Sequence, residues 1–397
     1  MPVKINGTVV KLQLDSGSAY TIIGENSFNT VFPKVKPRLM MPNFVLKDYQ
    51  SQVIEILGSC DVQVQLGAKV VTLPLVVAKS NRAKHVKIKE ENIKRLGDVL
   101  VEEIKLGRLS PDNFSQTDVH PNSDDAWALD WLFVVDTLNF CFWHNEKEEG
   151  WKVEGYTGYF ALCAAINRAQ REKIDILNPN FYSTIQEDQL QNILRSDTEV
   201  TCPLISERVN CLHEVGNTLL TVFNGSFKNV VMQSDKSARK LLNHIVEYFP
   251  CFKDEAVYKG HKVSFYKRAQ ILIGDIWSCF RNTGIGYFED INEITAFADY
   301  RVPQALLWYG VLEYDSALLE KLNANEVLKN GDNNEIEIRG CSLHAIEMVK
   351  DYAVKILGDR KINSILVDHF LWDFRRKHAE EILNKNLPFH KTFSIYY

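Results

Sequence analysis

The chain has 397 residues, of which 45% are hydrophobic and 24% are charged, and this composition is typical of a folded protein with one large core and a smaller second unit. No apolar run approaches the roughly 18–20 residues that a membrane span requires, and the first residues lack the apolar run of a secretory signal. We therefore expect two domains in a cytoplasmic protein that has no membrane partner.

Charge is distributed unevenly along the chain. Residues 1–84 contain ten Lys and Arg against five Asp and Glu, whereas the remaining residues contain 36 against 46. An acidic main body has no general attraction for a polyphosphate backbone, so no polymeric nucleic acid is expected as its direct partner. A single nucleotide needs only one or two local cations and remains open as a small-molecule substrate.

Residues 1–80 alternate apolar and polar positions in short runs that turn-forming residues separate. The runs fall at residues 3–5, 9–14, 53–57, 62–66 and 70–77, with Asn-Gly at 6–7 and Gly-Ala at 67–68 between neighbouring runs. Period-two runs of this length with such breaks indicate β-hairpins. The sequence therefore predicts a small all-β segment.

Asp15 lies in an Asp-Ser-Gly turn after one of the predicted strands. An aspartic protease uses such a turn to present one of two carboxylates that share a proton and activate water. Together with the flanking strands, the segment resembles the retropepsin-like protease of retrotransposon polyproteins, and this resemblance makes Asp15 the catalytic carboxylate of one half-site. The element that closes the retropepsin core has no counterpart after residue 78, so we favour an incomplete, inert segment over an active peptidase.

Residues 81–91 are rich in Ser, Asn, Lys, Arg and Glu, which suits a linker, and the hydrophobic period then becomes helical. Helical spacing recurs within residues 93–104, 127–142, 159–169, 190–194, 215–222, 238–249, 269–280, 305–312, 318–322, 343–357 and 365–383. The stretch Asp235-Lys236-Ser237 is placed to cap one helix, and Pro303 fits the start of another. We expect a mostly α protein, in which residues 92–397 form an all-α domain.

The helical region lacks the strong generic signatures of catalysis. It contains no P-loop, no HExxH and no Gly-x-Ser-x-Gly motif, and its histidines do not fall at metal-ligand spacings. The eight cysteines include no CxxC pair and several lie in apolar runs, which favours buried thiols over disulfides or zinc ligands. The sequence therefore predicts no metal site and no cofactor.

What remains is a set of carboxylates among aromatic and apolar residues: Asp275, Asp299, Asp368 and Asp373. A carboxylate with such neighbours is either paired structurally or part of a functional site. Asp368 and Asp373 are five residues apart on one predicted helix, so they lie about 140° apart around it and need not serve the same contact.

Long blocks of the region after about residue 85 resemble the queuosine salvage protein family. The blocks are residues 136–143, 192–198, 263–272, 297–304, 337–343, 388–390 and 395–397. The resemblance implies an all-α enzyme, related in fold to helix-hairpin-helix DNA glycosylases, that releases queuine from queuosine 5′-monophosphate. It also implies that Asp299, in the block Phe297-Ala298-Asp299-Tyr300-Arg301, is the catalytic aspartate.

Cleavage of an N-glycoside develops oxocarbenium character at the ribose, and a fixed anion near C1′ stabilises that charge or takes a proton from the attacking water. A cap for the helix that follows Pro303, or an ion pair with Arg301, is the alternative role for Asp299. Phe297 is expected to stack on the base, with plain core packing as its alternative.

Queuine also carries a secondary ammonium and a cyclopentene diol, which call for carboxylates or hydroxyl groups. The resemblance assigns these contacts to Asp368 and Asp373, and it adds His120 as a further substrate-binding residue, for which a surface loop is the alternative. For the 5′-phosphate we expect Lys267 and Arg268, or Arg339, with a solvated helix face as the competing account.

Three functions are thus weighed from the sequence. The nucleotide N-glycosidase is preferred because its blocks cover most of the helical region. An aspartic endopeptidase acting through Asp15 is the runner-up. A DNA repair glycosylase or nucleic-acid binder follows from the presumed fold alone, and the acidic net charge of the helical region argues against it.

Overall fold

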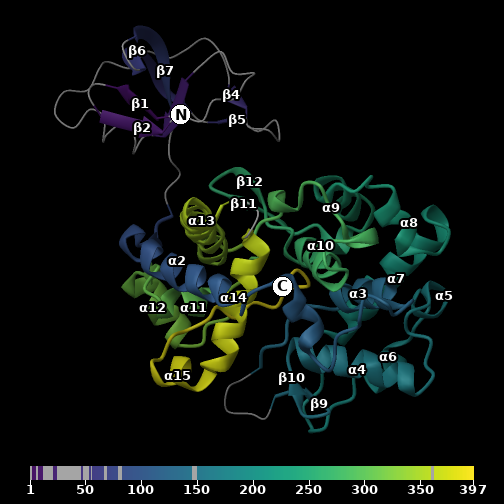
Figure 1. The fold of residues 1–397 in the computed structure, drawn as a ribbon. Coiled ribbons are helices and arrows are strands. Elements are labelled where there is room, and N and C mark those ends of the chain that lie inside the picture. Colours follow the sequence, from purple (N-terminus) through teal and green to yellow (C-terminus); the bar gives the residue numbers. More distant parts are fainter. Residues whose placement is uncertain are drawn as a thin grey trace. The chain divides into compact units, whose positions relative to one another are not determined.

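The computed structural model describes residues 2–5, 8–11, 21–24, 46–47, 53–54, 56–66, 69–78, 83–144, 150–358 and 362–397. The chain divides into two units, Met1–Ala83 and Lys84–Tyr397, and each is described by itself. Most described residues of the second unit lie in helices, so the prediction of a mostly α protein is confirmed (Figure 1).

The described residues of the first unit up to Ala78 lie in strands. A five-stranded sheet has the order β2-β1-β6-β7-β3, and its longest pair, β6 and β7, is antiparallel. These strands are β1 (Pro2–Ile5), β2 (Thr8–Lys11), β3 (Thr21–Gly24), β6 (Ile56–Leu66) and β7 (Lys69–Ala78), and the short strands β4 (Leu46–Lys47) and β5 (Val53–Ile54) form a separate pair. The alternation that predicted strands here is thus reflected in the structure, whereas Asp15 lies outside the described residues.

The predicted linker over residues 81–91 extends too far toward the C-terminus. Strand β8 (Val86–Ile88) pairs antiparallel with β13 (Leu312–Tyr314), and helix α2 (Glu90–Lys105) begins two residues after β8 ends. The backbone N–H of His85 also donates to Glu337 at 2.6 Å. These long-range contacts join residues 85–91 to the second unit, and a linker composition cannot reveal them.

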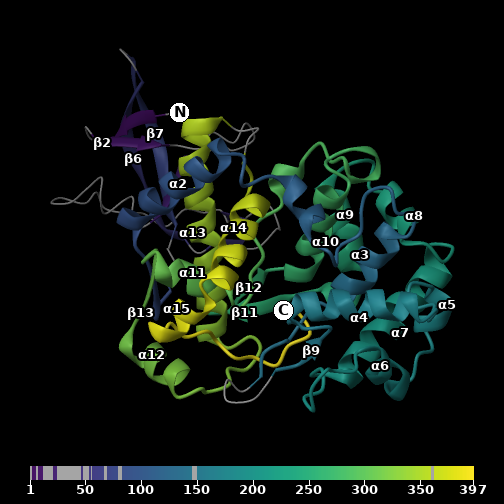
Figure 2. The same cartoon turned by 60° about the horizontal axis from the view of Figure 1, so that its bottom comes forward.

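The helices of the second unit form two groups, which Figures 1 and 2 show on either side of the central region of the unit. One group contains α2, α11 (Val302–Trp308), α12 (Ser316–Asn323), α13 (Asn333–Leu357), α14 (Ser364–Lys377) and α15 (Ala379–Asn384). The other contains α3 (Ala128–Thr137), α4 (Tyr159–Arg171), α5 (Pro179–Tyr182), α6 (Glu187–Ile193), α7 (Ile205–Val222), α8 (Phe227–Met232), α9 (Ala238–Tyr248) and α10 (Lys267–Cys279). Short 3₁₀ helices and two-stranded hairpins connect them, with η1 (Pro111–Gln116) leading toward α3.

Helix α10 lies at the centre of the core. Twelve of its thirteen residues are buried, and it packs against α3, α9 and η1. A helix that is apolar around most of its circumference must be covered on all sides, and α10 meets this condition. The predicted helix caps are confirmed: the Oγ of Ser237 accepts from the backbone N–H of Lys240 at 3.1 Å, and Pro303 occupies the first turn of α11.

Two predicted helices were too long. The helix expected over residues 127–142 ends at Thr137. Beyond that end, the guanidinium of Arg208 donates hydrogen bonds to the backbone carbonyls of Leu138, Phe140 and Cys141. The helix expected over residues 365–383 is divided at His378 into α14 and α15. In the first case a distant arginine stabilises a segment without regular secondary structure, which lines the cavity described below.

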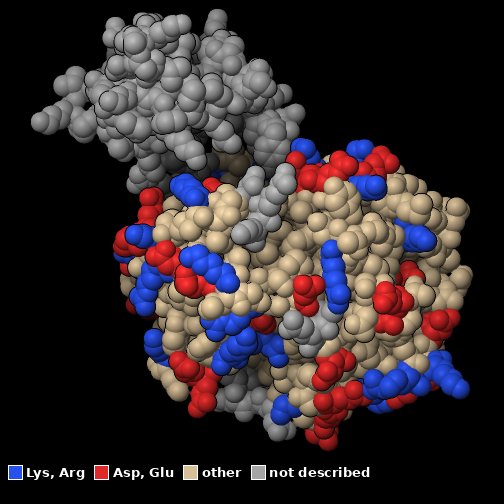
Figure 3. Space-filling view, viewed as in Figure 1, with Lys and Arg blue, Asp and Glu red and all other residues tan. Residues whose placement is uncertain are grey.

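Charges of both signs are interspersed over the face of the second unit that Figure 3 shows. In the described parts of the chain, none of the helices combines the length and the apolar character that crossing a membrane requires.

Candidate active site

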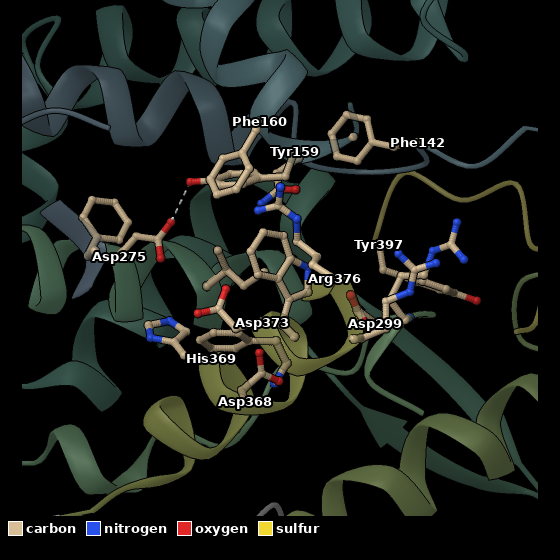
Figure 4. Close-up of a pocket in the computed structure, with 18 of the residues that line it drawn as sticks. Phe142, Tyr159, Phe160, Asp275, Asp299, Asp368, His369, Asp373, Arg376 and Tyr397 are labelled. Atoms are coloured by element: carbon tan, nitrogen blue, oxygen red, sulfur yellow. Dashed lines mark hydrogen bonds between the residues drawn. The ribbon is translucent and has the colours of Figure 1, made fainter. Parts of the chain in front are cut away.

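A cavity of about 290 Å³ lies in the second unit, and most of the residues predicted for the site line it (Figure 4). The lining comes from residues 109–120, residues 139–144, residues 157–160, helix α10, residues 297–301, helix α14 and Tyr397. His120, Lys267, Phe297, Asp299, Asp368 and Asp373 are all members of this lining. The fold therefore brings together residues that are up to 253 positions apart in the sequence, from His120 to Asp373.

Asp299 lies in the wall of the cavity, in the segment that leads into α11. Its Oδ1 accepts hydrogen bonds from the backbone N–H groups of Arg301 and Val302, both at 2.7 Å. The side chain is half-buried. Two N–H donors thus orient the carboxylate and stabilise its negative charge. The helix-cap role considered from the sequence is present, and it holds the carboxylate at the cavity instead of removing it from the site.

Phe297 forms an aromatic wall of the same cavity. It is buried, and its ring centroid lies 6.3 Å from that of His369. A Cβ atom at Gly274 would lie 2.9 Å from Cζ of Phe297, so the absence of a side chain there lets the ring pack directly on α10. Figure 4 shows further aromatic side chains at the cavity, Phe142, Tyr159 and Phe160. A flat substrate group can be held between such faces.

His120 is half-buried in the wall of the cavity, with one ring nitrogen engaged. Its Nδ1 lies 2.8 Å from the backbone carbonyl of Phe114, whose ring stacks on the imidazole with centroids 4.1 Å apart. Burial lowers the pKa of His120 to about 4, so the ring is neutral at physiological pH. Because the carbonyl can only accept, Nδ1 carries the proton and Nε2 is an acceptor. Among the described residues no group donates to this buried Nε2.

The two carboxyl groups of α14 lie in different surroundings. Asp368 is buried, and its Oδ1 accepts from the backbone N–H of Phe297 at 3.0 Å. Burial and the nearby charge of Asp299 raise the pKa of Asp368 well above its ordinary value. Burial also raises the pKa of Asp373, while Lys377 and Arg376 act in the opposite direction. Both residues line the cavity despite their separation around the helix.

Two of the three predicted phosphate-binding cations are placed elsewhere. Arg268 is absent from the lining: its guanidinium is buried and donates to the backbone carbonyls of Asp136, Thr137 and Cys251. Arg339 is also buried and pairs with Asp254 at 2.5 Å and with Glu335 at 3.0 Å. Both arginines therefore stabilise the core, and the expectation that they bind phosphate is wrong. A sequence cannot distinguish a cation that closes helix ends from one that faces a ligand.

Lys267 does line the cavity, but its neighbours are acidic. Burial lowers the pKa of its ammonium, and the charges of Asp299, Asp136 and Asp368 oppose that shift. An ammonium surrounded by carboxyl groups offsets their charge before it attracts another anion.

The sequence analysis did not select the guanidinium groups of Arg301 and Arg375, which also line the cavity. Oε1 of Gln304 accepts from Nη1 of Arg301 at 3.2 Å and from Nε of Arg375 at 3.1 Å, so one amide holds the two cations side by side. Burial and the charge of Arg301 lower the pKa of Arg375 to about 10, which leaves it charged at neutral pH. Arg301 and Gln304 belong to the block around Asp299, whereas Arg375 had no signal beyond its place two residues after Asp373.

Comparison with known proteins identifies a family for the part of the chain that contains most of the cavity lining. The family model described as queuosine salvage protein matches residues 119–397. The chain belongs to the queuosine salvage protein family. A relative from Mus musculus, named queuosine 5′-phosphate N-glycosylase/hydrolase, is 43% identical over 80% of this chain and 96% of its own length. Relatives of the same name from Bos taurus and Sphaerobacter thermophilus are 47% and 35% identical, over 70% and 69% of this chain and 84% and 83% of their own lengths.

The queuosine salvage match covers most of the cavity and none of the first unit. It includes His120, Phe297, Asp299 and both carboxyl residues of α14, whereas the lining residues 109–117 and the β segment precede it. Within the described ranges, no three His, Cys, Asp or Glu side chains are grouped closely enough to hold a metal ion.

Proposed function

We propose that this chain hydrolyses the N-glycosidic bond of queuosine 5′-monophosphate and releases queuine, which can then be reinserted into transfer RNA. Membership of the queuosine salvage family and the printed name of the relatives support this function. The observation that carries it is the half-buried Asp299, whose carboxylate is held by two backbone N–H groups beside an aromatic cavity.

In this proposal Asp299 acts at the ribose. As the bond between C1′ and the base nitrogen breaks, positive charge develops at C1′ and O4′, and a fixed carboxylate stabilises it. The same carboxylate takes a proton from the water that attacks C1′. Because Oδ1 is engaged by two N–H groups, Oδ2 is the atom assigned to these roles.

The queuine group is assigned to the part of the cavity lined by Phe297, His120 and the α14 carboxyl groups. Phe297 stacks on the deazapurine, and the neutral His120 accepts a hydrogen bond at Nε2. Asp373 is assigned to the secondary ammonium of queuine. Burial raises the pKa of this carboxyl group, and a cation bound beside it lowers the pKa again and so favours the carboxylate. Asp368, which is bonded to the Phe297 backbone, is assigned to the diol.

The 5′-phosphate is assigned to Arg301 and Arg375. Guanidinium groups bind phosphate oxygens through charge-assisted hydrogen bonds, and Arg375 lies close enough to Asp299 for their charges to interact. The phosphate would thus lie beside the ribose end of the substrate. Lys267 is left to balance the carboxyl groups around it.

The catalytic domain of this proposal is the second unit, and its relation to helix-hairpin-helix DNA glycosylases and its cytoplasmic location remain predictions. The β segment is proposed to be a passenger that resembles a retropepsin. The matched family and relatives give no support to the peptidase alternative.

The function is tested by incubating the full chain with queuosine 5′-monophosphate and following queuine by chromatography. We expect release by the wild-type protein, loss of at least about 1,000-fold in Asp299→Ala, and unchanged release in Asp15→Ala. No release from folded wild-type protein would overturn the proposed function. Release that depends on Asp15 instead of Asp299 would overturn the assignment of the site.

A further inference from the structure

Helix α10 presents a second carboxyl group to the cavity, away from Asp299. Lys267, Ile271 and Asp275 are four residues apart, lie on one face of the helix and all line the cavity. Asp275 is only 6% exposed, and its Oδ2 accepts a hydrogen bond from the hydroxyl of Tyr159 at 3.4 Å. Figure 4 shows Asp275 and Asp299 on opposite sides of the cavity.

Asp136, at the end of α3, lies close enough to Asp275 for their charges to interact. It is fully buried, and its Oδ1 accepts from Nδ2 of Asn139 at 3.1 Å. In the described part of the chain no group donates to its Oδ2. A buried carboxylate with an unsatisfied oxygen costs more free energy than a neutral carboxyl group in the same place, so burial favours bound protons on this pair.

The charges around Asp136 and Asp275 also favour bound protons on these two carboxyl groups. Four carboxyl groups, those of Asp136, Asp275, Asp299 and Asp368, surround the ammonium of Lys267. Burial raises the pKa of Asp136 to about 7, and burial together with the charge of Asp136 raises that of Asp275 well above its ordinary value. The other titratable or charged groups near the pair are Tyr159, Cys163, Cys279 and Arg268.

We propose that Asp275 is a further catalytic residue, held as a neutral acid beside Asp136, and that it gives its proton to the departing base. The proposal rests on the proposed function, because it needs a base that reaches across the cavity from a ribose at Asp299. A purine nucleoside can be protonated on the imidazole nitrogen N7, but a 7-deazapurine has carbon at that position. The carbonyl oxygen of its pyrimidinone ring is the acceptor that Asp275 serves.

The step is balanced in electrons and protons. The electron pair of the C1′–N bond moves onto the base, and the proton of Asp275 bonds to the carbonyl oxygen, so the base leaves neutral as a tautomer of queuine. The water oxygen bonds to C1′ and gives one proton to Asp299. Exchange with solvent then returns the proton to Asp275 and removes the one on Asp299. Asp136 is a positioning residue in this scheme, because it acts only through Asp275.

The first test compares two leaving groups. Asp275→Asn keeps the shape of the side chain but has no acidic proton, and 4-nitrophenyl riboside 5-phosphate releases a phenolate that needs none. We expect Asp275→Asn to lower kcat on queuosine 5′-monophosphate by about 100-fold or more and kcat on the nitrophenyl substrate by less than about threefold. Asp299→Ala should lose activity on both. Equal losses in Asp275→Asn on both substrates, or no loss on either, would overturn the proposal.

The second test uses the native substrate alone and a variant outside the cavity wall. Above pH 7 Asp136 is ionised and its negative charge opposes ionisation of Asp275. Asp136→Asn removes that charge, so the pKa of Asp275 falls and its acid form is lost at lower pH. We expect the alkaline limb of the kcat profile to move down by about one pH unit in Asp136→Asn and to stay in place in Asp235→Asn, a surface control. An unmoved limb in Asp136→Asn would overturn the proposal, while queuine release by the wild type would leave the proposed function intact.

Discussion

The site has an acidic side, where the buried carboxyl groups of Asp136, Asp275 and Asp368 lie near the ammonium of Lys267. On its cationic side the half-buried Asp299, which also lies near that ammonium, has the guanidinium groups of Arg301 and Arg375 for neighbours. Burial raises the pKa of the three carboxyl groups on the acidic side, which favours their protonated forms. At Asp299, two backbone N–H groups stabilise the negative charge instead. The comparison teaches that the same side chain serves as an acid or as an anion according to the groups that face it.

The largest effect is expected at the cationic side. Arg375→Met keeps the apolar stem and removes the guanidinium, so hydrogen bonds to the 5′-phosphate are lost. We expect the preference for queuosine 5′-monophosphate over the free nucleoside, measured as the ratio of the two kcat/KM values, to fall by about 10- to 100-fold. Arg239→Met, at an exposed ion pair with Glu293, is the matched control. An unchanged ratio in Arg375→Met would place the phosphate elsewhere.

His120, whose imidazole is neutral at physiological pH, tests whether an uncharged acceptor contributes to substrate binding. His120→Phe keeps an aromatic ring against Phe114 but removes the acceptor Nε2, and we expect KM for queuosine 5′-monophosphate to rise by about tenfold. Because the pKa of His120 is about 4, the wild type should keep this contact throughout pH 6–8 and lose it as the pH falls through 4. Steady-state KM values measured across this pH range check both expectations. A KM of His120→Phe equal to that of the wild type would leave His120 with packing alone.

Asp136 links the acidic side to stability. Its pKa is raised from 3.8 to about 7 by burial, so the stability that its protonated form contributes is fully present below pH 4 and is lost as the pH rises through 7. Asp136→Asn cannot ionise, and we expect the excess of its free energy of unfolding over that of the wild type to be about 2–3 kcal/mol larger at pH 8.5 than at pH 5. Urea unfolding at the two pH values measures this difference. An excess that is the same at the two pH values would contradict a raised pKa of Asp136.

The smallest effect on substrate binding is expected at Gly274, where helix α10 packs against Phe297. Its Cβ would lie 2.9 Å from Cζ of Phe297, so Gly274→Ala must shift the end of the ring that we assign to base stacking. We expect KM to rise a few-fold, with a stability loss of about 1 kcal/mol. Gly340→Ala, where no atom lies within 4 Å of the added Cβ, is the matched control. If the two variants had the same KM, the position of Phe297 would not control binding.

The block around Asp299 shows how much of the site was accessible from the sequence. Phe297 and Asp299 were selected there, and both line the cavity, as do His120, Lys267, Asp368 and Asp373. Arg268 and Arg339 were assigned to the phosphate because they stand in the same kind of block, but both are buried in the core. Block resemblance locates a residue near a site, but it does not say which way its side chain points.

The bounds of the helices and strands likewise separate into those that the sequence predicted and those that it did not. Hydrophobic period correctly placed most helices of the second unit, because one apolar face per helix is a local property of the sequence. It could not place strand β8, whose partner β13 is more than 200 residues away, nor the end of α3, which depends on the distant Arg208.

The sequence by itself determined the helical class and the family, and it selected the carboxylate that we propose as catalytic, because these depend on residue order and short-range spacing. Only the tertiary structure decided the charge states and the cation partners. Those depend on burial and on charges brought together from α3, α10, α11 and α14, and a carboxyl group or a guanidinium acquires its pKa from its neighbours in space.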